Sequence, residues 1–144
     1  MLFLLFRLHA DWYALEARAV MEVPYNYNHD LVLYYTDRAP NAAEALRVAK
    51  IEMARRQDLE TLDAYAWALA ASGDLAEAQK QMDRVLAVGL RDASLFYHAG
   101  AIAAKRKDAS AAVRYFNESL LVSSESDSAN AARTALKEMN PGDD

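Results

Sequence analysis

The chain has 144 residues, of which 53% are hydrophobic and 26% are charged, and its formal net charge is −5. This length allows one domain or one short repeat array and excludes two full-sized domains. The absence of cysteine excludes disulfides, zinc sites built from thiolates and a cysteine nucleophile. The acidic balance argues against a general nucleic-acid-binding protein, because such a protein needs a basic face.

The composition favours helices. Alanine makes up about one residue in five, whereas the chain has only four glycines and three prolines. Alanine has the highest helix propensity and allows helices to approach closely. We therefore expect an all-α protein with tightly packed helices.

The chain begins with a short apolar segment, residues 1–6, which Arg7 interrupts. A membrane-spanning helix needs about 20 apolar residues, and a secretory signal begins with basic residues, which are missing here. We expect a hydrophobic turn that packs on the next helix; the alternatives are a start within a longer protein and a degenerate membrane signal. No membrane insertion is expected, and the compartment stays unassigned, with the cytoplasm as the default.

Residues 10–23 form the first predicted helix, with large and small apolar side chains on one face. These are Trp12, Tyr13, Leu15, Ala19 and Val20. Together with the apolar start of the chain, this helix would leave apolar surface exposed. Such patches usually mark contacts, so a homo-oligomer formed through the N-terminal helix is possible.

From residue 25 onward, a pattern of two helices recurs about every 34 residues. The second helix of each pair opens with NAAEA at 41–45, DLAEA at 74–78 and DASAA at 108–112. The first helices match at the same spacing, because Leu62, Tyr65, Ala66 and Leu69 precede Phe96, Ala99, Gly100 and Ala103 by 34 residues. This period is typical of a helical repeat array.

Residues 25–124 resemble three tandem tetratricopeptide (TPR) repeats. The positions that carry the resemblance are the small residues Ala66 and Gly100, Gly73 at the inter-helix turn, and the large residues Met82 and Phe116. Repeat 1 departs from the family pattern, since Asn28 replaces the leading aromatic residue, Val32 fills the small position and Pro40 replaces the turn glycine. The resemblance implies a right-handed helical solenoid of antiparallel helix pairs.

We expect a single domain over residues 1–144. Its predicted parts are an N-terminal half-repeat helix (1–24), repeat 1 (25–58), repeat 2 (59–92), repeat 3 (93–124), and a capping helix with a tail (125–144). Local signals agree with these boundaries. Capping boxes are predicted at Asn41 with Glu44 and at Asp74 with Glu77, N-caps at Asp58, Asp92 and Ser126 or Asp127, and a left-handed C-cap at Gly89.

No motif points to catalysis, a cofactor or a metal. The four glycines are too scattered to cradle a phosphate. His9, His29 and His98 fall on different predicted helices, and we expect His98 to be partly exposed. The basic residues 105–107 are expected to be solvated and to favour the end of their helix. The sequence therefore predicts a non-enzymatic protein without cofactors.

The resemblance implies a concave groove lined by the first helix of each repeat. The candidate groove residues are His29, Leu33, Asp37, Glu60, Asp63, Trp67, Tyr97 and Lys105. Trp67 is the candidate anchor, because large aromatic residues dominate binding surfaces. The alternative is that it packs sideways, in part on Leu33. The lysines and asparagines with which some TPR domains clamp a chaperone C-terminus are absent.

These features predict a scaffold that binds a protein or peptide partner in its groove. The expected partner segment has apolar anchors and some positive charge, because acidic residues lie at one end of the groove and Lys105 lies at the other. The alternative is a structural role, in which the chain is one section of a larger or self-associating solenoid.

Overall fold

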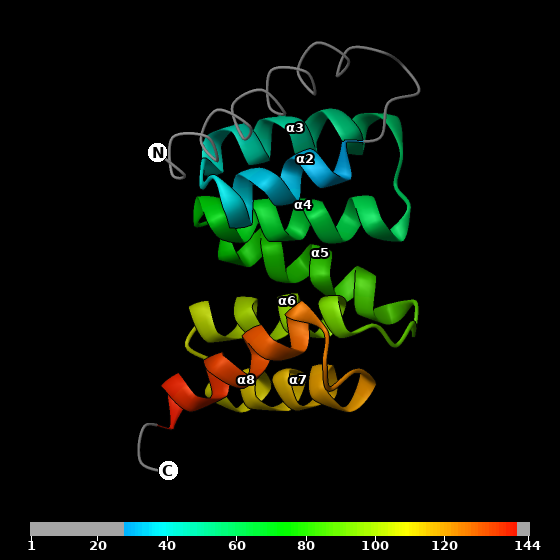
Figure 1. Ribbon diagram of the computed structural model, residues 1–144. Coiled ribbons are helices and arrows are strands. Elements are labelled where there is room, and N and C mark those ends of the chain that lie inside the picture. The colour runs from blue at the N-terminus through cyan, green and yellow to red at the C-terminus, as the bar shows by residue number, and fades with distance from the viewer. Residues whose placement is uncertain (1–27, 141–144) are drawn as a thin grey trace, which may run out of the picture. The chain divides into compact units, whose positions relative to one another are not determined.

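A computed structural model describes residues 28–140, and all regular secondary structure in this range is helical (Figure 1). It consists of seven α-helices and one π-helical segment, η1. The predicted all-α class is confirmed for this part of the chain. The predicted half-repeat at residues 1–24 and the tail from residue 141 lie outside the described residues.

The chain divides into two compact units, Met1–Ser72 and Gly73–Asp144. The division falls at the turn between the two helices of predicted repeat 2. In unit 1 the described elements are α2 (His29–Leu33), η1 (Tyr34–Arg38), α3 (Ala42–Arg55) and α4 (Leu59–Ser72). In unit 2 they are α5 (Leu75–Ala87), α6 (Ala93–Lys105), α7 (Ala109–Val122) and α8 (Asp127–Met139).

The core of unit 1 lies where α2, α3 and α4 pack against one another. Its buried residues are Leu31, Val32, Tyr35, Ala45, Val48, Ala49, Ala64 and Ala68. Four of these eight are alanines, so the helices approach closely and the larger side chains of α2 and η1 fill the remaining space.

The first helix of repeat 1 ends in a π-helical segment, which the sequence did not predict. The Ala39 amide bonds the Tyr34 carbonyl at 2.9 Å, one residue further back than in an α-helix. Pro40 has no amide hydrogen, and the next amide, that of Asn41, bonds the Tyr35 carbonyl at 2.8 Å. The chain thus leaves η1 through wide turns that span Pro40.

The core of unit 2 centres on Phe116 of α7, which is 1% exposed and is packed among Ala103, Ala112 and Ala132. Gly100 of α6 lies directly over this ring. A Cβ at Gly100 would lie 2.6 Å from Cδ1 and 2.7 Å from Cε1 of Phe116. The prediction that Gly100 occupies a close crossing between helices is therefore confirmed for α6 and α7.

The N-caps follow the predicted period. Asp58, Asp92 and Ser126 are spaced 34 residues apart, and their side-chain oxygens accept backbone hydrogen bonds at the starts of α4, α6 and α8. Asn41, Asp74 and Asp108 do the same for α3, α5 and α7. Each cap satisfies an amide that the helix itself leaves unpaired. The predicted caps at Asn41, Asp58, Asp74, Asp92 and Ser126 are confirmed.

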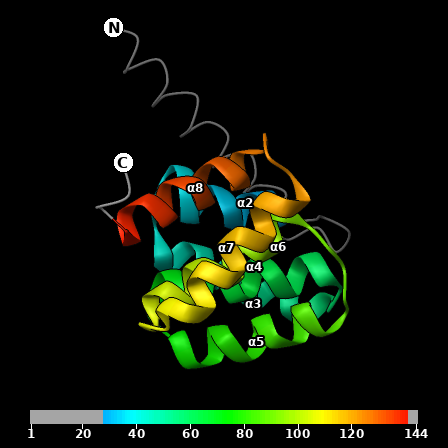
Figure 2. The same cartoon turned by 90° about the horizontal axis from the view of Figure 1, so that it is seen from below.

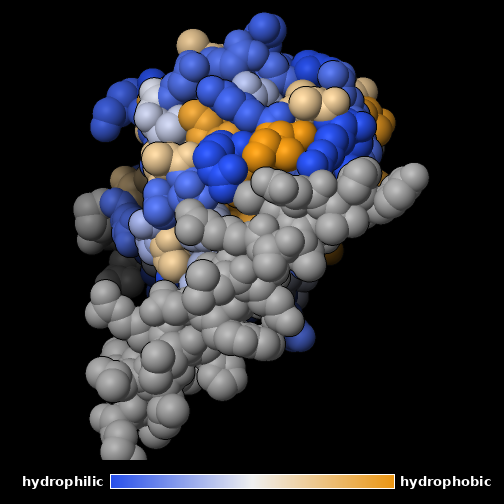
Figure 3. Space-filling view, turned by 90° about the horizontal axis from the view of Figure 1, so that it is seen from above, coloured by the Kyte–Doolittle hydropathy of each residue, from blue (hydrophilic) through white to orange (hydrophobic). Residues whose placement is uncertain are grey.

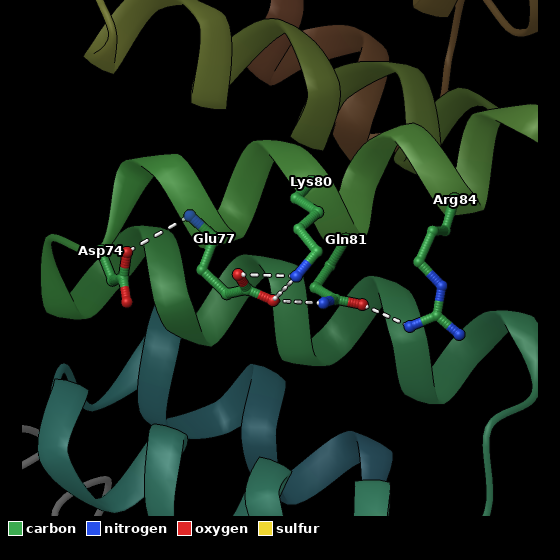
Figure 4. A network of polar contacts seen from close by, with 5 residues as sticks. All are labelled: Asp74, Glu77, Lys80, Gln81 and Arg84. Atoms are coloured by element: carbon green, nitrogen blue, oxygen red, sulfur yellow. Dashed lines mark hydrogen bonds and ion pairs between the residues drawn. The ribbon is translucent and has the colours of Figure 1, made fainter.

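The capping box predicted in α5 forms only in part (Figure 4). Asp74 Oδ1 accepts the Glu77 amide at 3.3 Å. The Glu77 carboxylate does not return this bond; it accepts from Gln81 Nε2 at 2.5 Å and from Lys80 Nζ at 3.3 Å. Gln81 in turn accepts from Arg84 at 2.7 Å. The result is a polar network along α5, which lowers the pKa of Glu77 through the bonds from Gln81 and Lys80.

Three turns use a left-handed residue. Gly73 and Gly89 have φ of 92° and 79°, so the C-cap predicted at Gly89 is confirmed. The third is Lys107, 34 residues after Gly73, with φ of 67°. The Asp108 amide bonds the Ala103 carbonyl and the Lys107 amide bonds the Ala104 carbonyl, both at 3.0 Å. This is a Schellman motif, in which glycine is the usual residue at the position of Lys107.

The surface seen in Figure 3 is mostly hydrophilic, with small apolar areas between the polar side chains on its coloured part. This mixture is expected of helices that bury one face and expose the other.

Candidate interaction surface

The predicted groove residues fall in both units. Unit 1 contains His29, Leu33, Asp37, Glu60, Asp63 and Trp67, and unit 2 contains Tyr97 and Lys105. Each set is considered within its own unit.

Trp67 and Asp37 form a hydrogen-bonded pair in unit 1. Trp67 Nε1 donates to Asp37 Oδ1 at 2.8 Å, and this bond joins α4 to η1 across 30 residues of sequence. The neighbours Ala66 and Ala68 are fully buried, whereas Trp67 is partly exposed. The ring is thus neither sealed in the core nor loose on the surface, and the carboxylate restrains its orientation.

The other unit 1 candidates differ in exposure. His29 retains 19% side-chain exposure, with Nδ1 3.3 Å from Asp30 Oδ1. Leu33 is partly exposed and Glu60 is exposed in the first turn of α4. Asp63 is only 3% exposed, so its carboxylate does not lie on the surface where we expected it. The reason is that α4 is buried over most of its circumference.

Charge is segregated within unit 1. Helices α2 and α4, together with η1, carry three exposed acidic residues, Asp30, Asp37 and Glu60, and Arg38 is the only lysine or arginine in these elements. The exposed basic residues Arg47, Lys50 and Arg55 lie on α3. The elements that carry Trp67 are therefore acidic.

In unit 2, Tyr97 is partly exposed and its ring centroid lies 6.0 Å from that of Phe116 and 5.8 Å from that of His98. One part of the ring therefore packs on the core, and Lys105 is exposed in the last turn of α6. His98 is 6% exposed and not partly exposed as we predicted. Helix α6 is buried on several sides, because it packs on α5, α7 and α8.

Two buried polar ties join the second helix of a pair to the start of the first. In unit 1, Asn28 Nδ2 donates to Glu52 Oε1 at 2.7 Å, and both residues are buried. In unit 2, Ser119 Oγ donates to the Ala93 carbonyl at 2.7 Å. Glu52 and Ser119 occupy the same repeat position, since each stands 11 residues after its helix N-cap. These ties were missed at the sequence level.

Glu52 is further neutralised by two arginines. Its carboxylate lies 3.6 Å from Arg55 Nη1 and 3.4 Å from Arg56 Nε. The sequence held one signal of this arrangement: Asn28 and Glu52 are both polar at positions where the repeat expects core residues. Two polar substitutions within one repeat are an indication that they pair.

Four large aliphatic side chains are exposed in unit 2: Val88, Leu90, Leu121 and Val122, with exposures from 36% to 76%. Two belong to the α5–α6 connection and two to the end of α7, and both segments lie on the same side of the unit (Figure 1 and Figure 2). Arg91 holds the segments together through a 2.7 Å bond to Glu118. The apolar end of unit 2, defined by these four residues, is a second exposed surface.

Within residues 28–140, no helix combines the length and apolarity needed to cross a membrane. In the same range, no group of three or more histidine and acidic side chains is placed to bind a metal ion. Comparisons with protein-family models, with curated proteins and with solved structures found no match.

Proposed function

We propose that this chain is a TPR-like helical solenoid that acts as a non-catalytic scaffold and binds a peptide or protein segment in a groove lined by its first helices. What supports the TPR-like assignment is the 34-residue spacing of the N-caps Asp58, Asp92 and Ser126, together with Gly73 and Lys107 in the same left-handed conformation. Solenoids of this kind use extended surfaces for binding.

The observation that carries the proposal is the partly exposed Trp67, restrained by Asp37. Tryptophan is enriched among residues that dominate binding energy. An aromatic ring that is already ordered loses little conformational entropy when a partner covers it. The acidic character of α2, η1 and α4 favours a partner segment with positive charge, and neither nucleic acid nor membrane insertion is part of the proposal.

The experiment selects binding segments from a displayed random-peptide library against the full chain and measures their affinities. Trp67→Ala is expected to weaken binding by about 2 kcal/mol or more, roughly thirty-fold, with helicity unchanged in circular dichroism. The matched control is Tyr115→Ala, another partly exposed aromatic residue, which lies on the second helix α7. Equal losses in both variants, or none in Trp67→Ala, would contradict the proposal.

A second candidate is a structural role, in which the chain assembles with further copies or with a longer solenoid. The observation in its favour is the apolar end of unit 2, because exposed apolar patches mark contacts. Sedimentation of the chain and of Leu121→Ser over a range of concentrations distinguishes the two. Self-association that Leu121→Ser reduces supports the structural role.

A further inference from the structure

We propose that the Asp37–Trp67 pair binds a cationic side chain of the partner segment, a lysine ammonium or an arginine guanidinium, with the cation over the indole face and beside the carboxylate. This inference rests on the proposed scaffold function and names the chemistry that its anchor recognises.

The geometry of the pair suits a cation. The 2.8 Å bond from Trp67 Nε1 to Asp37 Oδ1 fixes the carboxylate at the edge of the indole ring. Tryptophan is the aromatic side chain that attracts cations most strongly over its face. Hydrogen bonding of the indole N–H to an anion increases the electron density of the ring, and this strengthens that attraction. One cation can therefore interact with the ring and the carboxylate together.

The surroundings favour positive charge as well. Asp30, with 78% side-chain exposure, and Glu60 add to the charge of Asp37, and Arg38 is the single basic side chain of α2, η1 and α4. Exposed charges within about 10 Å of one another still interact at ordinary salt. A cation that approaches these elements is therefore attracted before it makes contact.

An apolar anchor fits this site less well. A leucine or phenylalanine placed on the Trp67 ring would displace water from the Asp37 carboxylate without supplying a hydrogen-bond donor. Burying a charge without a partner is unfavourable. A guanidinium or ammonium group replaces the lost water with its own donors, so the same contact becomes favourable. The pair therefore selects for a cation over an apolar group.

The test observes Trp67 directly. The chain contains two tryptophans, so the full-length variant Trp12→Phe leaves Trp67 as the single indole. Its Nε1–H signal is followed by NMR while N-acetyl-arginine amide is added at constant ionic strength. The matched probe is N-acetyl-citrulline amide, which has nearly the same shape and no charge. We expect the arginine probe to shift the signal along a saturating curve and the citrulline probe to bind at least about three-fold more weakly.

A second arm uses Asp37→Asn, in which the amide oxygen can still accept the indole hydrogen bond. We expect about three-fold weaker binding of the arginine probe, because the charge is lost while the ring stays oriented. Equal responses to the two probes, no response to the arginine probe, or an unchanged affinity in Asp37→Asn would each overturn the inference.

The outcomes separate this inference from the scaffold proposal. If library-selected segments bind through Trp67 but tolerate citrulline in place of each arginine and norleucine in place of each lysine, the cation site is wrong and the scaffold stands. If the arginine probe binds as expected but no segment depends on Trp67, the cation site stands and the scaffold proposal fails.

Discussion

Gly100→Ala places a single methyl group where α6 crosses α7, and two effects then oppose each other. Alanine is favoured over glycine inside a helix by about 0.8–1.0 kcal/mol. The new Cβ, however, would lie 2.6 Å and 2.7 Å from two ring atoms of Phe116. Both distances are shorter than any normal carbon–carbon contact, so the ring or the helix must move.

The ring has little room to move. Phe116 is 1% exposed and its core neighbours are buried alanines of α6, α7 and α8. Overpacking of a filled core costs about 1–3 kcal/mol. Because two ring atoms clash and the surroundings are closed, we expect the upper part of that range. After subtraction of the helix gain, Gly100→Ala is expected to destabilise unit 2 by about 1–2 kcal/mol.

The free energy of unfolding is measured by urea titration of circular dichroism, and amide exchange in α6 and α7 reports on unit 2 itself. The control is the same substitution in a Phe116→Leu background, where the smaller side chain makes room for the methyl group. There Gly100→Ala is expected to be neutral or stabilising, which gives a coupling of at least about 1 kcal/mol between the two sites. An increase in stability of the single variant Gly100→Ala would refute the reasoning.

Two further predictions concern helix ends. Lys107→Gly is expected to stabilise the chain by about 0.5–1 kcal/mol, because the left-handed conformation costs an L-residue about 1–2 kcal/mol and glycine loses part of this gain through its flexibility when unfolded; a urea titration measures it, and Lys107→Ala, which removes the charge but keeps the strained conformation, should show no such gain. The carboxyl of Asp92 is partly buried, which opposes its ionisation, but hydrogen bonds from Ser94 and Leu95 outweigh burial and hold its pKa below the usual value of 3.8. Its charge therefore contributes stability above pH 3.8, and this contribution is lost as the pH falls through the lower folded-state pKa. In urea titrations over this pH range, the stability difference between the chain and Asp92→Asn, which retains a capping oxygen, should shrink on acidification; a constant difference would contradict the assignment.

The helix starts were predictable because capping is local. Asp58 and Asp92 act on amides within three residues of themselves, so the sequence alone contains both partners. The crossing at Gly100 was predictable for another reason: it recurs at a fixed position of the repeat, where the family pattern requires a small residue.

The candidate site was harder to predict, because its contacts connect distant residues. The bond from Trp67 to Asp37 spans 30 residues and depends on η1, whose π-helical path follows from Pro40. The burial of Asp63 and His98 was missed because α4 and α6 are covered on several sides. A helix buried over most of its circumference has no clear apolar stripe, so periodicity cannot identify its exposed residues.

The two buried polar ties have a consequence for folding. Tandem repeats resemble one another, so during folding a second helix can pair with the wrong first helix. Glu52 fits opposite Asn28 with its amide donor, whereas Ser119 fits opposite the Ala93 carbonyl. In an exchanged pairing, the Glu52 carboxylate would face a carbonyl oxygen, and burying two acceptors against each other is strongly unfavourable. The ties therefore give each helix pair a distinct chemical key that discriminates against mispaired repeats, whatever they add to stability.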